Sequence, residues 1–298
     1  MSAPRWRAGR FEIDLGRPRV MAIVNVTPDS FSDGDPTPAQ AIARCERLLA
    51  EGADILDIGG ESTRPGAPAV DPETERARVV PVLQSAVRLG CPVSIDTTKA
   101  DVMRAALDLG ADIVNDVAAL RGPGSLDVVS AHDSCGVCLM HMRGTPQTMR
   151  EATRYDDVVT EVAAFLRERI AAVEAAGVAR ERIVADPGIG FAKTPEHNLA
   201  LLANQELLAA LGVPLLVGWS RKSTLARLAG VATPAPERNA DERARVAAAS
   251  VAAAVLAVER GARIVRVHDV AATVAGLAVW QAGGADNRRD PSSDPARP

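Results

Sequence analysis

The stretch Gly52-Ala53-Asp54-Ile55-Leu56-Asp57 decides the fold, because versions of it recur along the chain. GADIVN stands at residues 110–115 and GARIVR at 261–266, with weaker copies at 90–95, 136–140 and 212–217. Glycine commonly ends a helix, since it accepts left-handed backbone dihedrals. The apolar run behind it is typical of a parallel strand that is covered on both faces. The repeat therefore predicts helices that end in glycine and lead into buried strands.

Eight such strands predict a (β/α)8 TIM barrel, in the α/β class. We expect strands near 20–25, 54–59, 92–96, 112–115, 137–141, 182–186, 214–218 and 263–268. We expect helices near 38–51, 71–89, 99–109, 124–135, 157–176, 196–211, 222–229 and 241–260. Eight β-then-α units in about 250 residues match the barrel in count and length. A doubly wound sheet is the alternative, but no G-x-G-x-x-G follows the first strand.

The barrel is expected to form a single domain over residues 19–281. Residues 1–18 are expected as an N-terminal extension, in which a short hairpin over 5–18 covers the N-terminal face of the barrel. Residues 282–298 are rich in Gly, Asp, Arg, Ser and Pro, which predicts a flexible, disordered tail.

Composition indicates a cytoplasmic protein that acts on small molecules. The chain has 298 residues, 47% of them apolar, so a sizeable core can form. The net charge of −4 comes from scattered residues, and no basic run suggests a nucleic-acid partner. No apolar run approaches the ~20 residues of a membrane helix, and residues 1–10 lack the apolar segment of a signal peptide. Four cysteines in so long a chain do not suggest a disulfide framework.

Polar residues stand at the expected C-terminal ends of the strands. They are Asn25, Asp96, Asn115, His141, Asp186, Ser220 and His268, with residues 61–64 just beyond the second strand. Barrel active sites lie on that face, so polar strand ends in register predict catalysis rather than packing.

The first two loops suit an anion and its metal. In VNVTPDSFSDG (residues 24–34) the first expected strand ends at Asn25, and a polar loop follows. The carboxamide oxygen of Asn25 could bind a hard cation, since such cations prefer oxygen donors. ESTRPGA (61–67) can offer a hydroxyl, backbone amides and a guanidinium to an anion. An ordinary solvated turn is the alternative for this second loop.

Asp96, Asn115 and Asp186 are expected inside one barrel mouth. Their oxygens could accept the N–H donors of a heterocycle such as a 2-amino-4-oxo pyrimidine ring. The alternative is general acid/base chemistry, in which close carboxylates would raise one pKa.

The loops after strands six, seven and eight complete the mouth. DPGIGFAKT (186–194) is an irregular loop whose backbone can approach a ligand, and Phe191 within it is either a ligand contact or a loop anchor. Ser220-Arg221-Lys222 follows strand seven, and Arg266 and His268 share one face of strand eight. Barrels often bind phosphate between these two loops, although Arg266 could instead pair internally with Asp96 or Asp186.

Other motifs are expected to be structural. Cys135 and Cys138 form a lone C-x-x-C with no second pair, so zinc or redox function is not expected. His132 and His197 are expected to be structural, and the charges of 237–245 are expected to form a solvated helix start.

Together these motifs resemble those of dihydropteroate synthases over roughly residues 19–280. The matching segments are 25–34, 57–67, 94–97, 114–117, 139–144, 186–194, 220–222 and 266–270. The resemblance implies a (β/α)8 barrel, which in this family usually forms a homodimer and acts in folate biosynthesis. It implies a reaction that joins (7,8-dihydropterin-6-yl)methyl diphosphate to 4-aminobenzoate and releases diphosphate and 7,8-dihydropteroate.

The resemblance also implies a role for each matched residue. The catalytic set is Asp96, Lys222, Arg266 and His268. The pterin would contact Asp96, Asn115, Val117, Met140, Asp186, Gly218 and Lys222. The diphosphate would contact Asn25, Thr63, Arg266 and His268, with Mg²⁺ held by Asn25. The aminobenzoate would contact Phe31, Thr63, Arg64, Pro65, Phe191 and Ser220. An SN1-like substitution is expected, with loops 26–37 and 62–70 closing over it.

The chain departs from the family pattern in two places. The first loop continues Gly34-Asp35-Pro36, where the family usually has a second glycine, and the last expected helix carries Val246 to Ser250, where members often place Gly before Ser or Thr. Two alternatives stay open. One is a methyltetrahydrofolate-binding methyltransferase domain, which would not need the anion-binding residues, and the other is a pterin-binding paralogue without turnover.

Overall fold

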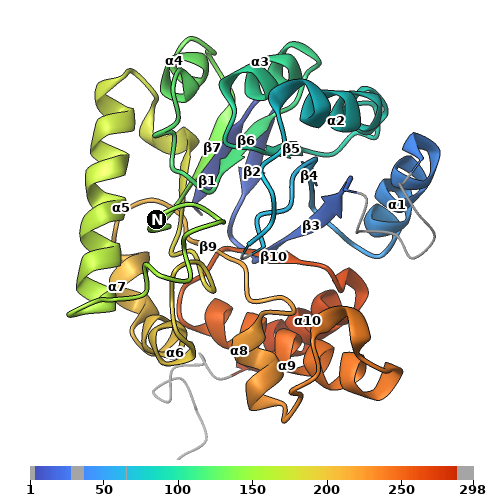
Figure 1. Cartoon of the computed structure of the whole chain (residues 1–298), viewed down its shortest axis with the longest axis vertical. Helices are drawn as coiled ribbons and strands as arrows, with labels where there is room; N and C mark the ends of the chain where they lie inside the picture. Colours follow the sequence, from blue (N-terminus) through green and yellow to red (C-terminus); the bar gives the residue numbers. More distant parts are fainter. Residues whose placement is uncertain (1–3, 28–36, 65, 287–298) are drawn as a thin grey trace, which may run out of the picture.

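The computed structural model describes residues 4–27, 37–64 and 66–286, and within them eight parallel strands form a barrel surrounded by helices (Figure 1). The strands are β3 (Arg19–Asn25), β4 (Ile55–Gly59), β5 (Val93–Asp96), β6 (Ile113–Asp116), β7 (Gly136–Met140), β8 (Ile183–Asp186), β9 (Leu216–Val217) and β10 (Ile264–Val267). Their order is β8-β7-β6-β5-β4-β3-β10-β9, and a parallel bridge between Ala185 and Leu215 joins the two ends. The (β/α)8 barrel predicted from the repeat is confirmed.

Strand β9 is shorter than its predicted range of 214–218. Pro214 has no N–H to donate to a ladder, so regular pairing begins only at Leu216. The segment nevertheless bonds to both neighbours. The Pro214 carbonyl accepts from the N–H of Ala185 at 3.0 Å, and the Leu215 carbonyl accepts from the N–H of Arg263 at 2.9 Å.

Helices cover the outside of the barrel (Figure 1). They are α1 (Pro38–Ala50), α2 (Pro72–Ala86), α3 (Ala100–Asp108), α4 (Ser125–Ser130), α5 (Val158–Ala175), α6 (Pro195–Ala203), α7 (Gln205–Ala209), α8 (Ser223–Leu228), α9 (Ala240–Glu259) and α10 (Val270–Asp286), with 3₁₀ turns η2 (Arg180–Arg182) and η3 (Ala235–Glu237). Several starts carry a side-chain cap. Thr37, Thr194 and Asn239 form capping boxes, and Asn239 begins the helix predicted from the charges of 237–245. In this described part of the chain no helix is long and apolar enough to cross a membrane.

Two helix predictions were wrong. The helix expected over 196–211 is split at Asn204, whose ψ of 24° ends α6 before α7 begins. Helix α10 was not predicted, and it extends past 282, where the tail was expected to begin; residues 287–298 lie outside the described part. Its glycines weakened the helical signal, but Gly276 is required by packing, since a Cβ there would lie 2.6 Å from Val251 of α9.

The predicted N-terminal hairpin is confirmed as β1 (Arg5–Ala8) and β2 (Phe11–Asp14), paired antiparallel. Its apolar side chains pack on the inward-facing residues of the barrel strands. This cluster comprises Trp6, Ala8, Ile13, Leu15, Met21, Ile55, Ile113, Cys138, Val184, Leu216 and Ile264. Trp6 is fully buried, and its indole N–H donates to the Arg182 carbonyl at 2.9 Å. The hairpin thus fills one end of the barrel and leaves the polar strand ends at the other.

Candidate active site

The strand register places the predicted polar residues side by side at the barrel mouth. Asn25 of β3 is level with Gly59 of β4, Gly59 with Asp96 of β5, and Asp96 with Asn115 of β6. A Cβ at Gly59 would lie 3.3 Å from the Cβ of Asp96, so glycine leaves space beside that carboxylate. The prediction that these strand ends converge is therefore confirmed by the pairing itself.

Arg266 of β10 crosses the mouth and bridges two carboxylates. Its Nε donates to Asp57 Oδ2 at 2.6 Å, and its Nη2 donates to Asp96 Oδ2 at 2.5 Å. Asn115 Nδ2 also donates to Asp57 Oδ2, at 3.1 Å. The internal ion pair with Asp96 left open by the sequence is present, whereas Asp186 is not part of it. Asp57 was not predicted as a site residue, although it stands two positions before the strand end, on the same face as Gly59.

Burial makes this cluster electrostatically unusual. Desolvation raises the pKa of Asp96 to about 7, with Arg266 opposing the rise and Asp57 adding to it. It also raises the pKa of Asp186 to about 6 and, together with Arg266, lowers the pKa of Lys222 to about 8. For Arg266 burial lowers the pKa, but Asp57 and Asp96 outweigh it and the pKa is raised. The mouth thus holds acids poised to accept hydrogen bonds from a ligand's N–H groups.

The other residues predicted for the pterin lie around these charges. Val117 and Met140 belong to one apolar cluster with Met142, Met149, Phe191 and Ala192. A Cβ at Gly218 would meet no atom within 4 Å, so the space beside it is open. Asp186 accepts from the N–H of Gly188 at 2.7 Å, which fixes one carboxylate oxygen and leaves the other for a ligand.

Ser220 and His268 form a second polar pair at the mouth. Ser220 Oγ accepts from the backbone N–H of His268 at 3.1 Å and lies 3.0 Å from its Nδ1. Burial, followed by Arg221 and Arg266, holds the pKa of His268 well below its ordinary value. The ring is therefore neutral before an anion arrives, so it offers an N–H donor rather than the positive charge that the prediction assumed.

A cavity of about 390 Å³ opens beside His268. Its lining is Arg44, Arg47, Leu48, Glu51, Arg221, His268, Asp269, Val270, Ala271 and Ala272. Arg221 has a positive φ of 59° and is paired with Asp269, and its N–H donates to Ser250 Oγ at 3.0 Å. Arg47 and Arg221 are paired with Glu51 and Asp269 of the same lining, so Arg44, the neutral His268 ring and the start of α10 are what this side of the mouth offers to an anion.

The loop after β4 is anchored by charges that were not predicted. Lys99 contacts Glu61 Oε2 at 2.6 Å and also Glu75, while Glu61 Oε1 accepts from the N–H of Val70 at 2.8 Å. Glu75 is fully buried, and desolvation raises its pKa. Thr63 is half-buried and Arg64 exposed on this loop. Phe31 and Pro65, both predicted for the aminobenzoate, lie outside the described residues.

A second unpredicted anchor holds the loop after β8. Lys193 Nζ lies 2.8 Å from His141 Nδ1 and 3.0 Å from the carbonyls of Gly188 and Phe191. The Phe191 ring, predicted as a contact or an anchor, faces the Lys222 ammonium 4.1 Å from its centroid. The FAKT sequence contains Lys193, but a lysine in a loop carries no signal that it is buried.

The residues discounted from sequence are structural. Cys135, just before β7, and Cys138, within it, are free and buried in different apolar clusters. His132 Nδ1 accepts from the N–H of Cys135 at 3.0 Å, and His197 completes the cap of α6. Within the residues that the structure describes, no group of three or more His, Cys, Asp or Glu is placed to hold a metal ion.

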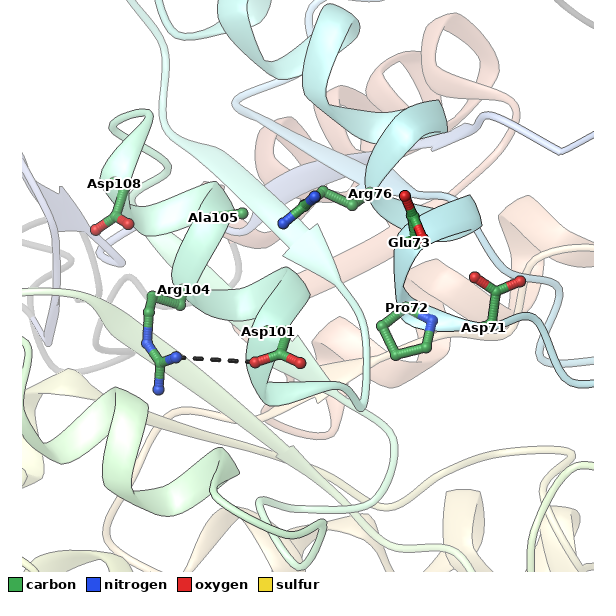
Figure 2. Close-up of a pocket in the computed structure, with 8 residues that line it drawn as sticks. All are labelled: Asp71, Pro72, Glu73, Arg76, Asp101, Arg104, Ala105 and Asp108. Carbon is green, nitrogen blue, oxygen red and sulfur yellow. Dashed lines mark ion pairs between the residues drawn. The ribbon is translucent and has the colours of Figure 1, made fainter.

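A larger groove of about 630 Å³ lies between α2 and α3, away from the predicted residues (Figure 2). It is lined by Asp71, Pro72, Glu73, Arg76, Asp101, Arg104, Ala105 and Asp108. Asp71 caps α2, and Arg104 and Asp101 form an exposed ion pair at 3.8 Å. Mixed charges that cap and pair within their own helices do not favour a catalytic site.

Asn25 fits a magnesium ion shared with a phosphate. Its amide lies half-buried at the end of β3, at the same mouth as Arg266. Mg²⁺ usually keeps several waters and takes only one or two protein oxygens plus those of a substrate phosphate. The amide oxygen of Asn25 is one such protein ligand, which is consistent with that mode of binding.

Comparisons with known proteins show which proteins this chain resembles over most of its length. A family model described as "Pterin binding enzyme" matches residues 21–268. Dihydropteroate synthase from Neisseria meningitidis serogroup B (strain ATCC BAA-335 / MC58) is 52% identical over 286 residues, which cover 94% of this chain and 97% of the relative. Dihydropteroate synthase from Xanthomonas albilineans, solved with 4-aminobenzoic acid, is 50% identical with a TM-score of 0.85, covering 95% of this chain and 99% of that chain. The enzyme from Burkholderia cenocepacia, solved with 7,8-dihydropteroate, is 48% identical with a TM-score of 0.85, covering 97% and 99%.

Proposed function

Since the chain belongs to the pterin-binding enzyme family, among its dihydropteroate synthases, we infer that the barrel mouth is where this synthase binds its substrates. It joins (7,8-dihydropterin-6-yl)methyl diphosphate to 4-aminobenzoate and releases diphosphate and 7,8-dihydropteroate. The observation that carries the inference is the Arg266 bridge to Asp57 and Asp96 among the strand ends. A methyltransferase domain would not need this anion side of the mouth.

The acidic half of the mouth is assigned to the pterin ring. Asp96, Asn115 and Asp186 supply acceptors for its N–H donors, while Val117 and Met140 supply apolar contacts. Before substrate binds, the pKa of Asp96 is about 7, so this carboxyl is partly protonated at neutral pH. Donors from the ring stabilise the ionised form, so the ligand would draw Asp96 towards the carboxylate. Gly218 leaves room, and Lys222 adds a donor next to Phe191.

The basic half is assigned to the diphosphate. Arg266 and the neutral ring of His268 donate to its oxygens, Thr63 adds a hydroxyl, and Asn25 holds Mg²⁺ on it. The bound metal ion would neutralise charge that develops on the leaving oxygens. Arg266 is already held by two carboxylates, so it is oriented before the substrate arrives and little reorganisation is needed.

The aminobenzoate is assigned to the outer part of the mouth. Phe191, Ser220, Thr63 and Arg64 border it, together with Phe31 and Pro65 from the segments outside the described residues. An arylamine is nucleophilic as the neutral base at pH 7, so no strong general base is required. We therefore propose an SN1-like substitution in which the pterin stabilises a methylene cation and Asp96 contributes its negative charge nearby.

Two further properties are part of the proposal. Large apolar side chains stand exposed on adjacent helices, namely Leu228 on α8, Leu256 on α9 and Val279 on α10, at 61%, 46% and 74%. A second copy of the chain would cover this surface, so we propose a homodimer, tested by sedimentation equilibrium. Four unpaired, buried cysteines are suited to a reducing compartment, so we propose a cytoplasmic enzyme.

The metal assignment has a direct test. Asn25→Ala should raise the Mg²⁺ concentration needed for half-maximal turnover, because a protein ligand to the ion is removed while the diphosphate and water ligands remain. Asn204→Ala, which alters an exposed amide in the α6–α7 junction, is the matched control and should leave that concentration unchanged. An unaltered Mg²⁺ requirement in the folded Asn25 variant would refute this role.

A further inference from the structure

Lys193 is almost completely buried, with 8% of its surface exposed, at the end of the loop that follows β8. Its ammonium is surrounded by acceptors from two different segments. Nζ contacts the carbonyls of Gly188 and Phe191 at 3.0 Å within the loop, and Nδ1 of His141 at 2.8 Å at the end of β7. Nζ also lies 3.4 Å from the His141 carbonyl, so four acceptors surround the three N–H donors of the ammonium and its donor capacity is filled.

His141 is fixed as a neutral acceptor. Its ring is buried and meets the Phe165 ring edge-on, with the centroids 4.8 Å apart. Burial, with Lys193 and Arg143 adding to it, lowers the pKa of His141 to about 2. Its Nδ1 lone pair is therefore available to Lys193, and the ring proton resides on Nε2. The contact between Lys193 and His141 joins β7 to the loop after β8.

Backbone geometry shows how closely the loop is held to β7. Gly188 has a φ of 68°, and a Cβ there would lie 2.0 Å from the carbonyl oxygen of His141. The N–H of His141 in turn donates to the Asp186 carbonyl at 2.9 Å. Lys193 bonds to the same Gly188, so the ammonium closes a turn that only glycine can make at this distance.

The loop carries two of the groups assigned to substrates, Asp186 and Phe191, and it contacts a third, Lys222. Gly188 donates to the Asp186 carboxylate at 2.7 Å, and Phe191 faces Lys222. A Cβ at Gly190 would lie 2.9 Å from Cδ of Lys222, so the loop backbone also limits where that lysine can extend. A shift of the turn would therefore move Phe191 and its contact with Lys222, whereas Asp186 is held in β8 by its pairing with β7.

We propose that Lys193, held against His141, is a positioning residue that sets the 186–193 loop so that Phe191, in contact with Lys222, meets the aminobenzoate. It touches no substrate itself. This inference rests on the proposed function of the mouth. The ammonium is an unfavourable group to bury, since desolvation lowers the pKa of Lys193 to about 7 while Asp186 opposes this and Lys222 and Arg143 add to it. An apolar side chain would avoid that penalty but would remove the donor from the Phe191 carbonyl and from His141 Nδ1, and would leave the Gly188 carbonyl with only the N–H of Phe191.

The test compares Lys193→Met with the wild-type enzyme. The variant should raise KM for 4-aminobenzoate about tenfold, the equivalent of one or two lost hydrogen bonds, while KM for the pterin diphosphate changes less. Hydrogen exchange of the backbone amides of residues 188–193 should become faster. Lys99→Met is the matched control, because it removes a half-buried lysine from the other loop and should leave exchange at 188–193 unchanged.

The partner side is tested by two changes at His141. His141→Asn keeps an acceptor near the position of Nδ1 and should retain slow exchange in the loop, whereas His141→Leu should not. In a double-mutant cycle, His141→Leu should add little to Lys193→Met, because the two changes break one contact. If Lys193→Met fails to fold, the comparison of His141→Asn with His141→Leu still tests whether the contact between Lys193 and His141 positions the loop.

Folded Lys193→Met protein with unchanged KM for 4-aminobenzoate and unchanged exchange at 188–193 would overturn the inference. So would loss of stability without any change in the ratio of the two KM values, since that is what a purely structural lysine gives. Absence of turnover in the wild-type enzyme would contradict the proposed function instead, and the exchange measurement would still test the role of Lys193.

Discussion

Replacing Asp96 with asparagine should make the substrate-free protein increasingly stable relative to the wild type as pH rises from 4 to 8, although it weakens pterin binding. Burial raises the pKa of Asp96 to about 7 from an ordinary 3.8, with Arg266 opposing the rise and Asp57 adding to it. Between these two values the folded protein binds a proton that the unfolded chain has released. Because the folded state binds more protons in this window, the free energy of unfolding falls as pH rises through it.

The two pKa values set the size of the effect. At 1.36 kcal/mol per pKa unit, the difference between about 7 and 3.8 is worth about 4 kcal/mol. An asparagine does not titrate, and it can still accept a hydrogen bond from Arg266. We therefore expect the stability of Asp96→Asn relative to wild type to rise by about 2–4 kcal/mol between pH 4 and pH 8.

Urea unfolding followed by circular dichroism at several pH values measures this difference. Asp108→Asn, which alters an exposed carboxylate in the last turn of α3, is the control and should show a nearly constant difference from wild type. A stability difference for Asp96→Asn that does not change with pH, or that changes in favour of the wild type as pH rises, would refute the reasoning that burial controls this carboxyl.

Three further changes test other parts of the structure. Trp6→Ala should lower the free energy of unfolding by about 3–5 kcal/mol, because a fully buried indole that plugs the barrel is removed; a loss below about 1 kcal/mol in urea unfolding would contradict that packing. Gly218→Ala should fold normally, since its Cβ meets nothing within 4 Å, but calorimetry should show weaker pterin binding, while Gly283→Ala in α10 leaves binding unchanged. Equal pterin affinity in the Gly218→Ala and Gly283→Ala variants would show that the pterin ring does not lie beside Gly218. Lys99→Met should speed hydrogen exchange across 61–70 by freeing Glu61 and leaving Glu75 without its cation; protection equal to wild type would show that another contact holds the loop.

The barrel was predictable because its information is local and repeated. Each glycine-ended helix leads into an apolar strand within a few residues, so strand positions and the polar ends at Asn25, Asp96 and Asn115 follow from the sequence. Helix α10 was missed because Gly276 lowers helical propensity, and only its contact with Val251 explains the glycine. The break at Asn204 was missed because no proline marks it.

The predicted site was incomplete because its anchors depend on contacts between distant residues. Asp57 and Arg266 are 209 positions apart, and Lys193 and His141 are 52 apart. Lys99 reaches Glu61 and Glu75 over 38 and 24 positions. No local pattern distinguishes such a buried charge from a solvated one, so the sequence predicts the polar residues at the strand ends but not the charged residues that anchor the loops around them.

The most direct test of the account is diphosphate release by the purified protein with Mg²⁺ and (7,8-dihydropterin-6-yl)methyl diphosphate, with and without 4-aminobenzoate. The account predicts release that depends on 4-aminobenzoate, yields 7,8-dihydropteroate in equal amount and is blocked by a sulfonamide competing for the aminobenzoate position. Pterin binding without formation of 7,8-dihydropteroate would contradict it, because the same mouth would then hold the ring without carrying out the transfer.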